Sequence, residues 1–295
     1  MLKIGTRRSE LALWQANYVQ QFLKNSGYAS KIIEIESFGD QILDIPIHKL
    51  GDKGVFTKAL DIALLNYKID LAVHSLKDVP TEFEENLTLA SVPARENPLD
   101  VLVRPLDRQN SEKNIIATGS ERRKAFWLNK YPNYEITGLR GNVQTRIVKV
   151  DNNYWTGGIF AFAGLKRLGL NDRISETLDW MLPAPSQGAL GIVCRSNDEK
   201  NLAIFRMLED EFIRKCVDTE RLFLNTLGSG CSSPVGALTT YKDGVFSFNG
   251  AILSRDGAEK MEIHENLPKD KYDQEWGKQL AKKLIEDGAF KLLER

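Results

Sequence analysis

The stretch LKIGTRRSELALWQANYVQQFLKNSGYASKIIEI, residues 2–35, decides the fold class. Residues 2–5 are a short apolar run of the kind that forms a buried strand. Ser9 is a typical helix-capping residue, and apolar residues recur after it at helical spacing as far as Phe22. Residues 31–35 have the pattern of a second strand. Strand, helix and strand in this order predict a mostly parallel sheet with helices on both faces.

The same alternation continues along the chain and restarts after Pro98. A helix is expected at residues 57–65 and a compact apolar strand at 69–74. Beyond Pro98, strands are expected at 101–103, 115–118 and 134–139, and helices at 121–130 and 142–150. Proline and glycine residues interrupt the pattern at 183–188, and an apolar stretch follows at 189–194. Such an interruption is typical of a linker that crosses between two α/β units.

A different pattern begins at Asp210. A long helix is expected at residues 212–227, and a loop rich in Gly and Ser follows it at 228–233. The remaining expected elements are strands at 235–241, 245–253 and 260–264 and a closing helix at 273–286. Turns containing Asp-Gly separate these strands and favour hairpins. The pattern predicts a small α+β unit.

Charge and composition exclude several function classes. Lys plus Arg and Asp plus Glu number 40 each, so the chain has no global attraction for nucleic acid or an anionic membrane. No apolar run approaches the ~20 residues that a membrane span needs. The first residues lack the apolar core of a signal peptide, so we expect a cytoplasmic protein. The three cysteines and three histidines have no metal-ligand spacing, so no metal is expected.

Arginines gather where expected strands end. They are Arg7 and Arg8 after the first strand, Arg122 and Arg123 after the strand ending at Thr118, and Arg140 and Arg146 around residues 141–145. Ligands of open α/β sheets bind beyond the carboxyl ends of the strands, and guanidinium groups bind carboxylates through paired hydrogen bonds. The pattern predicts a ligand with several carboxylates or phosphates, without which the cluster would be poorly neutralised. Ordinary surface arginines are the alternative.

Lys77 and Asp78 follow the apolar strand at 69–74, and Pro80 stops further regular structure. A carboxylate at this position can orient a ligand N–H group, stabilise a developing positive charge or move a proton. Alternatively, Asp78 is a turn residue that binds its own backbone.

Cys231 lies on a Gly-rich loop, where a thiol is accessible and adaptable, as a covalent attachment point requires. The alternative is a small loop residue with no chemical role. Cys194 and Cys216 fall in an apolar strand and a helix, where packing is expected. The loop at 51–58 lacks the spacing of a phosphate-binding P-loop, so ATP is not indicated.

Taken in order, these segments resemble the porphobilinogen deaminase family, the hydroxymethylbilane synthases. The similar segments are TRRSELALWQA (6–16), the loop at 51–58, HSLKDVP (74–80), GSERR (119–123), LRGNVQTR (139–146), AGLKRLG (163–169), QGA (187–189) and GC (230–231). The resemblance implies three domains: two α/β lobes similar to type II periplasmic binding proteins and an α+β domain with a three-stranded antiparallel sheet. Their expected limits are 1–93 with 188–206, 99–182, and 211–295. Pro185 and Ser186 depart from the family pattern, which more often has a smaller, less rigid pair there.

The resemblance also implies a transferase that condenses four porphobilinogen molecules head to tail into the linear tetrapyrrole hydroxymethylbilane, releasing ammonia. It implies a dipyrromethane cofactor joined through a thioether to Cys231, and Asp78 as the catalytic residue that holds the pyrrole N–H groups. Cofactor contacts are expected from Cys231, Asp78, Lys77, Arg122, Arg123, Ser120 and Thr118. Substrate contacts are expected from Arg7, Ser9, Gln15, Lys53, Arg140, Arg146, Arg167 and Gln187. A monomer without metal, nucleic acid or membrane partner is expected.

Two other function classes fit parts of the sequence. One is a non-catalytic, two-lobed protein that binds a small dicarboxylate; the missing export signal and the domain with Cys231 count against it. The other is an RNA-binding protein that uses the arginine clusters. Zero net charge and the lack of a basic, aromatic-rich sheet disfavour RNA binding.

Overall fold

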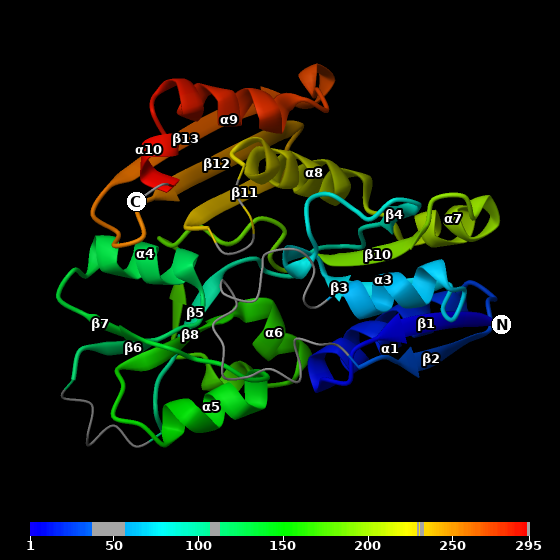
Figure 1. Cartoon of the computed structure of the whole chain (residues 1–295), viewed down its shortest axis with the longest axis horizontal. Coiled ribbons are helices and arrows are strands. Elements are labelled where there is room, and N and C mark those ends of the chain that lie inside the picture. Colours follow the sequence, from blue (N-terminus) through cyan, green and yellow to red (C-terminus); the bar gives the residue numbers. More distant parts are fainter. Residues whose placement is uncertain (37–56, 107–112, 229, 231–232, 294–295) are drawn as a thin grey trace.

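The computed structural model describes residues 1–36, 57–106, 113–228, 230 and 233–293 of the 295-residue chain. They form two α/β lobes, each with a five-stranded sheet, and a third unit with a three-stranded sheet. In Figure 1 the third unit lies above the two lobes. The predicted fold class is confirmed, whereas the exact domain limits stay predictions.

Lobe 1 is built on a sheet with the strand order β2-β1-β3-β10-β4. Its elements are β1 (Leu2–Thr6), β2 (Ser30–Glu34), β3 (Leu71–Ser75), β4 (Leu87–Ser91), β10 (Leu190–Arg195), α1 (Glu10–Asn25), α3 (Lys58–Leu65) and α7 (Glu199–Phe205). β1, β2 and β3 are parallel, whereas β10 is antiparallel to β3 and β4. Helices α1 and α7 pack around Leu23 and Phe205 on one face, and α3 packs around Leu64 on the other. Because helices cover both faces of this sheet, every residue of β10 is buried.

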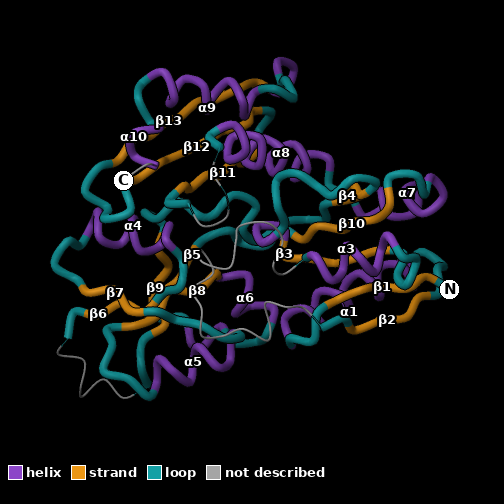
Figure 2. The backbone as a smooth tube through the Cα atoms, in the orientation of Figure 1, coloured by secondary structure: helices purple, strands orange, loops and turns teal. Residues whose placement is uncertain are grey.

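Lobe 2 repeats this plan with the strand order β7-β6-β8-β5-β9. Its elements are β5 (Asp100–Val103), β6 (Ile115–Ala117), β7 (Glu135–Thr137), β8 (Gly157–Ala161), β9 (Glu176–Leu178), α4 (Glu121–Lys130), α5 (Val143–Asp151) and α6 (Phe162–Arg167). β6, β7 and β8 are parallel, and β5 is antiparallel to β8 and β9. The chain crosses between the lobes twice, from β4 to β5 and from β9 to β10 (Figure 2).

The third unit places its sheet between its own helices and lobe 2. Its elements are α8 (Glu211–Thr226), β11 (Val235–Lys242), β12 (Val245–Leu253), β13 (Lys260–Pro268), α9 (Trp276–Glu286) and α10 (Phe290–Leu293). Helices α8 and α9 cover the sheet around Phe223, Phe248 and Trp276. Ala251 of β12 packs into the core that contains Phe126 of α4. The third unit is thus fixed to lobe 2 by apolar packing.

Some observed elements have no clear sequence signal, and β8 illustrates the reason. Two glycines open this strand, and glycine normally weakens a strand. A Cβ atom on Gly157 would lie 2.7 Å from the carbonyl oxygen of Val103, so the close approach of β5 requires glycine. The sequence patterns also miss β4, β9, α6, α7 and α10. The strand expected at 260–264 continues to Pro268, and the closing helix begins at Trp276.

None of the helices in the described part of the chain has the length and apolar character that crossing a membrane requires.

Candidate active site

Strand polarity brings the predicted site residues together. β10 and β5 run against their neighbours, so their first residues lie where β3 and β8 end: Leu190 pairs with Ser75, and Asp100 pairs with Ala161. Gln187, just before β10, therefore lies beside Lys77, just after β3. This junction is the edge at which ligands of α/β sheets bind.

Asp100 is the centre of the ionic contacts at this junction. Its carboxylate is completely buried and accepts hydrogen bonds at Oδ1 from Arg123 Nε (3.0 Å) and Nη2 (2.8 Å). Nη2 of Arg122 lies 2.7 Å from Oδ2. Burial opposes ionisation of Asp100, but the two guanidiniums outweigh it and lower the pKa of the carboxyl to about 2. Asp100 therefore supplies one counter-charge that Arg122 and Arg123 share, so the protein itself neutralises part of the expected cluster.

Lys77 joins the same set of contacts through Gln187. Nζ of Lys77 lies 3.1 Å from Oε1 of Gln187, whose Nε2 donates to Asp100 Oδ1 at 2.9 Å. Removal from water, and then the positive charge of Arg123, lower the pKa of the Lys77 amine to about 8. The structure thus brings four predicted residues into one connected group around Asp100: Lys77, Arg122, Arg123 and Gln187.

Asp78 is exposed at the end of a short 3₁₀ turn, Leu76–Asp78, that follows β3. Buried Leu76 anchors this turn in the core of lobe 1. From the third unit, Arg221 of α8 donates to the carbonyl oxygens of Val79 (3.1 Å) and Pro80 (2.5 Å). A helix of the third unit therefore holds the backbone of the turn that presents Asp78, a role for Arg221 that no sequence pattern indicates.

Four of the predicted polar residues have local structural contacts. Oγ of Ser9 caps α1 through Ala12 N at 3.3 Å, and Oγ of Ser120 accepts from Arg123 N at 3.5 Å. Oγ1 of Thr118 accepts from Ser120 N at 3.2 Å, and Gln15 donates to Ser75 Oγ at 2.8 Å. The contacts of Ser9, Thr118 and Ser120 lie at the starts of α1 and α4, and Gln15 links α1 to the end of β3. The proposed ligand contacts of these four residues stay predictions.

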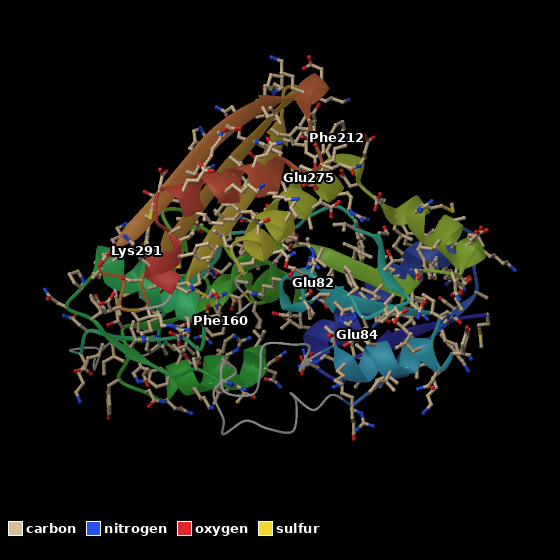
Figure 3. The ribbon with its side chains drawn as sticks, turned by 45° about the horizontal axis from the view of Figure 1, so that its top comes forward. Glu82, Glu84, Phe160, Phe212, Glu275 and Lys291 are labelled. Atoms are coloured by element: carbon tan, nitrogen blue, oxygen red, sulfur yellow. The ribbon has the colours of Figure 1, made fainter. Side chains whose placement is uncertain are left out.

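Arg146 and Arg167 belong to α5 and α6 of lobe 2. The guanidinium of Arg146 lies 5.5 Å from the centre of the ring of Phe160; Figure 3 labels Phe160 in lobe 2. Burial, followed by the positive charge of Arg123, lowers the pKa of Arg146 to about 10. Nη2 of Arg167 donates to the carbonyl oxygen of Gly188 at 2.7 Å, which ties lobe 2 to the second crossing segment. Both arginines therefore reach the edge predicted for ligand binding.

The remaining arginines divide into two groups. Arg7 and Arg140 are half-buried where β1 and β7 end, and burial lowers the pKa of Arg140. Arg8 is exposed and pairs with Glu34 and Glu36, which makes it a surface residue. Lys53 and Cys231 lie outside the described residues.

Four positive side chains and two carboxylates interact electrostatically at the junction. The cations are Lys77, Arg122, Arg123 and Arg146, and the carboxylates are Asp78 and Asp100. Nε of Arg122 is buried and has no hydrogen-bond partner among the described residues. Excess positive charge and an unused donor favour a ligand with carboxylate groups.

A second buried carboxylate, Glu220 of α8, connects the third unit to both crossing segments. It pairs with Arg95 in the first segment (Nη1–Oε1 2.6 Å, Nη2–Oε2 3.0 Å) and accepts from the backbone N–H of Ser186 in the second at 2.6 Å. It also accepts from Thr239 N of β11 at 2.7 Å. Ser186 has a positive φ of 65°, so the second residue of the unusual Pro185-Ser186 pair is held in a left-handed conformation next to Gln187.

Within the described ranges, no group of three or more His, Cys, Asp or Glu side chains has an arrangement that could hold a metal ion.

Comparison with known proteins identifies the family. Residues 2–203 match the family described as "Porphobilinogen deaminase, dipyromethane cofactor binding domain", and residues 214–286 match "Porphobilinogen deaminase, C-terminal domain". The chain is 42% identical to the porphobilinogen deaminase of Syntrophotalea carbinolica over 99% of this chain and 95% of the relative. It is 40% identical to that of Staphylococcus aureus over 100% of this chain and 97% of the relative. A periplasmic substrate-binding protein from Coxiella burnetii superposes with a TM-score of 0.44 and 13% identity, over 70% of this chain and 91% of its own. The chain belongs to the porphobilinogen deaminase family.

Proposed function

We propose that this protein is a transferase that condenses four porphobilinogen molecules head to tail into hydroxymethylbilane on a covalent dipyrromethane primer, with release of ammonia. The observation that carries the proposal is the group of four cations around Asp78 and Asp100 at the junction of the lobes. Porphobilinogen has two carboxylates, so each added unit brings charge that such a site can bind. The protein acts as a monomer, and neither nucleic acid nor a membrane takes part.

The side chains at the junction fit a dipyrromethane group. Its two pyrrole rings bring four carboxylates, and Arg122, Arg123 and Lys77 supply positive charge from both lobes. Ser120 and Thr118, at the start of α4, lie at a helix N-terminus that also favours an anion. Cys231 is the proposed attachment point. When bound, the group supplies the nucleophilic pyrrole carbon, and the protein supplies orientation and electrostatics.

Asp78 is the proposed catalytic residue. A pyrrole N–H can donate to its exposed carboxylate, which fixes the ring relative to the cations of both lobes. Departure of ammonia leaves positive charge on the substrate, and a carboxylate held in a fixed turn stabilises that charge without reorganising. The contacts of Arg221 with Val79 and Pro80 keep the turn in place.

Substrate carboxylates are proposed to bind to the remaining predicted residues, which are Arg7, Ser9, Gln15, Lys53, Arg140, Arg146, Arg167 and Gln187. Arg146 is the best supported of these, because it interacts electrostatically with Asp78 and Arg123. Its half-buried guanidinium gains more from an anionic partner than an exposed one would.

Intact-mass analysis of the denatured protein, combined with an ammonia assay, tests the function. We expect added mass equal to two linked pyrrole units on the peptide that contains Cys231, and four ammonia molecules released per tetrapyrrole formed. A protein that gains no adduct after incubation with porphobilinogen and releases no ammonia would instead support the two-lobed dicarboxylate-binding protein.

A further inference from the structure

One buried carboxylate connects cations that come from both lobes. Asp100 opens β5 of lobe 2, whereas Lys77 follows β3 of lobe 1. Gln187 of the second crossing segment bridges them, because it contacts Lys77 Nζ at 3.1 Å and donates to Asp100 at 2.9 Å. Gln187 is completely buried, and its Nε2 also donates to the carbonyl oxygen of Pro98 at 2.7 Å. The amide therefore has little freedom to turn away from either partner.

We propose that Asp100 is a positioning residue for the transfer reaction, which holds Arg122 and Arg123 directly and orients Lys77 through Gln187. This proposal rests on the proposed function, in which these three cations bind the dipyrromethane carboxylates. In this role Asp100 does not contact the dipyrromethane. It sets the spacing of Arg122, Arg123 and Lys77, which bind the dipyrromethane carboxylates.

Geometry explains why a carboxylate is needed at this position. The side chains of Arg122 and Arg123 are only 4% and 7% exposed, and both lie against one carboxylate that is completely buried. Arg123 uses its Nε and Nη2 on Asp100 and its Nη1 on the carbonyl oxygen of Ile159 (2.8 Å), so its plane is fixed. Without the negative charge, two adjacent buried guanidiniums would repel each other and separate.

The same arrangement predicts a pH effect that loss of packing alone would not produce. The charged groups that act on Lys77 are Arg123, Asp78, Asp100 and Arg122. Asp100 raises the pKa of Lys77, and the arginines lower it. Replacing Asp100 with a neutral residue therefore moves loss of the Lys77 proton to lower pH, and the alkaline limb of the activity profile follows it.

Asp100→Asn in the holoenzyme is the direct test. We expect kcat per mole of bound dipyrromethane to fall about 10- to 100-fold, the range for loss of a buried, charged hydrogen-bonded contact. KM for porphobilinogen should change by less than about threefold, because the proposed substrate arginines keep their contacts. The alkaline limb should shift to lower pH. Asp100→Glu restores the charge and should return the limb toward its wild-type position even if kcat stays low.

Asp151→Asn is the matched control, because Asp151 also pairs with an arginine of lobe 2, Arg173 (2.6 Å), but belongs to none of the contacts around Asp100. It should leave cofactor content and the pH profile unchanged. If Asp100→Asn yields no folded protein, Gln187→Leu cuts the link to Lys77 while leaving the arginine pairs, and the alkaline limb should still shift.

The outcomes separate this proposal from the proposed function. Suppose that wild-type protein carries the adduct and releases ammonia, and that the pH profiles of Asp100→Asn and Gln187→Leu are identical to that of wild type. This result overturns the positioning role alone. Wild-type protein without adduct or ammonia release overturns the function, and the positioning role with it.

Discussion

Glu220→Gln tests whether one buried carboxylate joins the third unit to both crossing segments. The substitution keeps the shape of the side chain but removes the charge that pairs with Arg95, whose side chain is 5% exposed beside a completely buried partner. It also places an amide donor among N–H groups of Ser186 and Thr239 that need an acceptor. Breaking a buried ion pair by changing one partner costs about 3–5 kcal/mol.

That free energy converts to a measurable melting shift. At about 2.1 cal/mol/K per residue, the 295-residue chain has an unfolding entropy of about 0.6 kcal/mol/K. A loss of about 3–5 kcal/mol therefore lowers Tm by about 5–8 °C. Scanning calorimetry at fixed cofactor content measures the shift directly.

Asp218→Asn is the matched control on the same helix. Asp218 pairs with Arg214 at 2.8 Å, but its side chain is 45% exposed, and exposed pairs contribute about 0–1 kcal/mol. Its Tm should fall by less than about 2 °C. Equal melting shifts for Glu220→Gln and Asp218→Asn would refute the reasoning, because burial would then make no difference.

The remaining predictions concern the site. Asp78→Ala should abolish turnover while Tm stays within about 2 °C of wild type, because the side chain is exposed; near-normal ammonia release would remove Asp78 from the mechanism. Cys231→Ser should yield protein without the pyrrole adduct, whereas Cys194→Ser, which changes a buried thiol in β10, should keep it; an adduct on Cys231→Ser, seen by intact mass, would exclude that attachment point. The folded-state pKa of Lys77 is lowered to about 8, so its positive charge is lost as pH rises through that value, and binding of carboxylate ligands should weaken there. Lys77→Arg should abolish this alkaline limb in the pH profile of kcat per mole of bound dipyrromethane, and an unchanged limb would assign it to another group. Protein with dipyrromethane should melt above apo-protein, because the group neutralises excess positive charge; identical Tm values would contradict that account.

Local sequence patterns were sufficient for most of the fold. Ser9 and the apolar spacing after it predict α1, and a second helix is expected at 121–130; the structure places α1 at Glu10–Asn25 and α4 at Glu121–Lys130. These signals are local, since capping and helical periodicity involve residues within a few positions of one another. The same holds for Lys77 and Asp78, which follow an apolar strand directly.

The partners of those residues could be found only in three dimensions. Asp100 lies just before the strand expected at 101–103 and has no sequence signal of its own. It is nevertheless the counter-charge for Arg122 and Arg123, because β5 runs antiparallel and starts where its neighbours end. Glu220 and Arg221 read as ordinary polar residues of an amphipathic helix, and they contact segments more than thirty positions away.

The sequence by itself thus determined the α/β class, the small third unit and the positively charged residues at strand ends, because each depends on short-range patterns. The tertiary structure decided which charges meet, how the two crossing segments are tied to the third unit and why Gly157 must lack a side chain. The physical reason is that ion pairing and close packing depend on distances through space. Those distances are set only when the chain folds, by the direction of each strand and by the return of the chain into lobe 1.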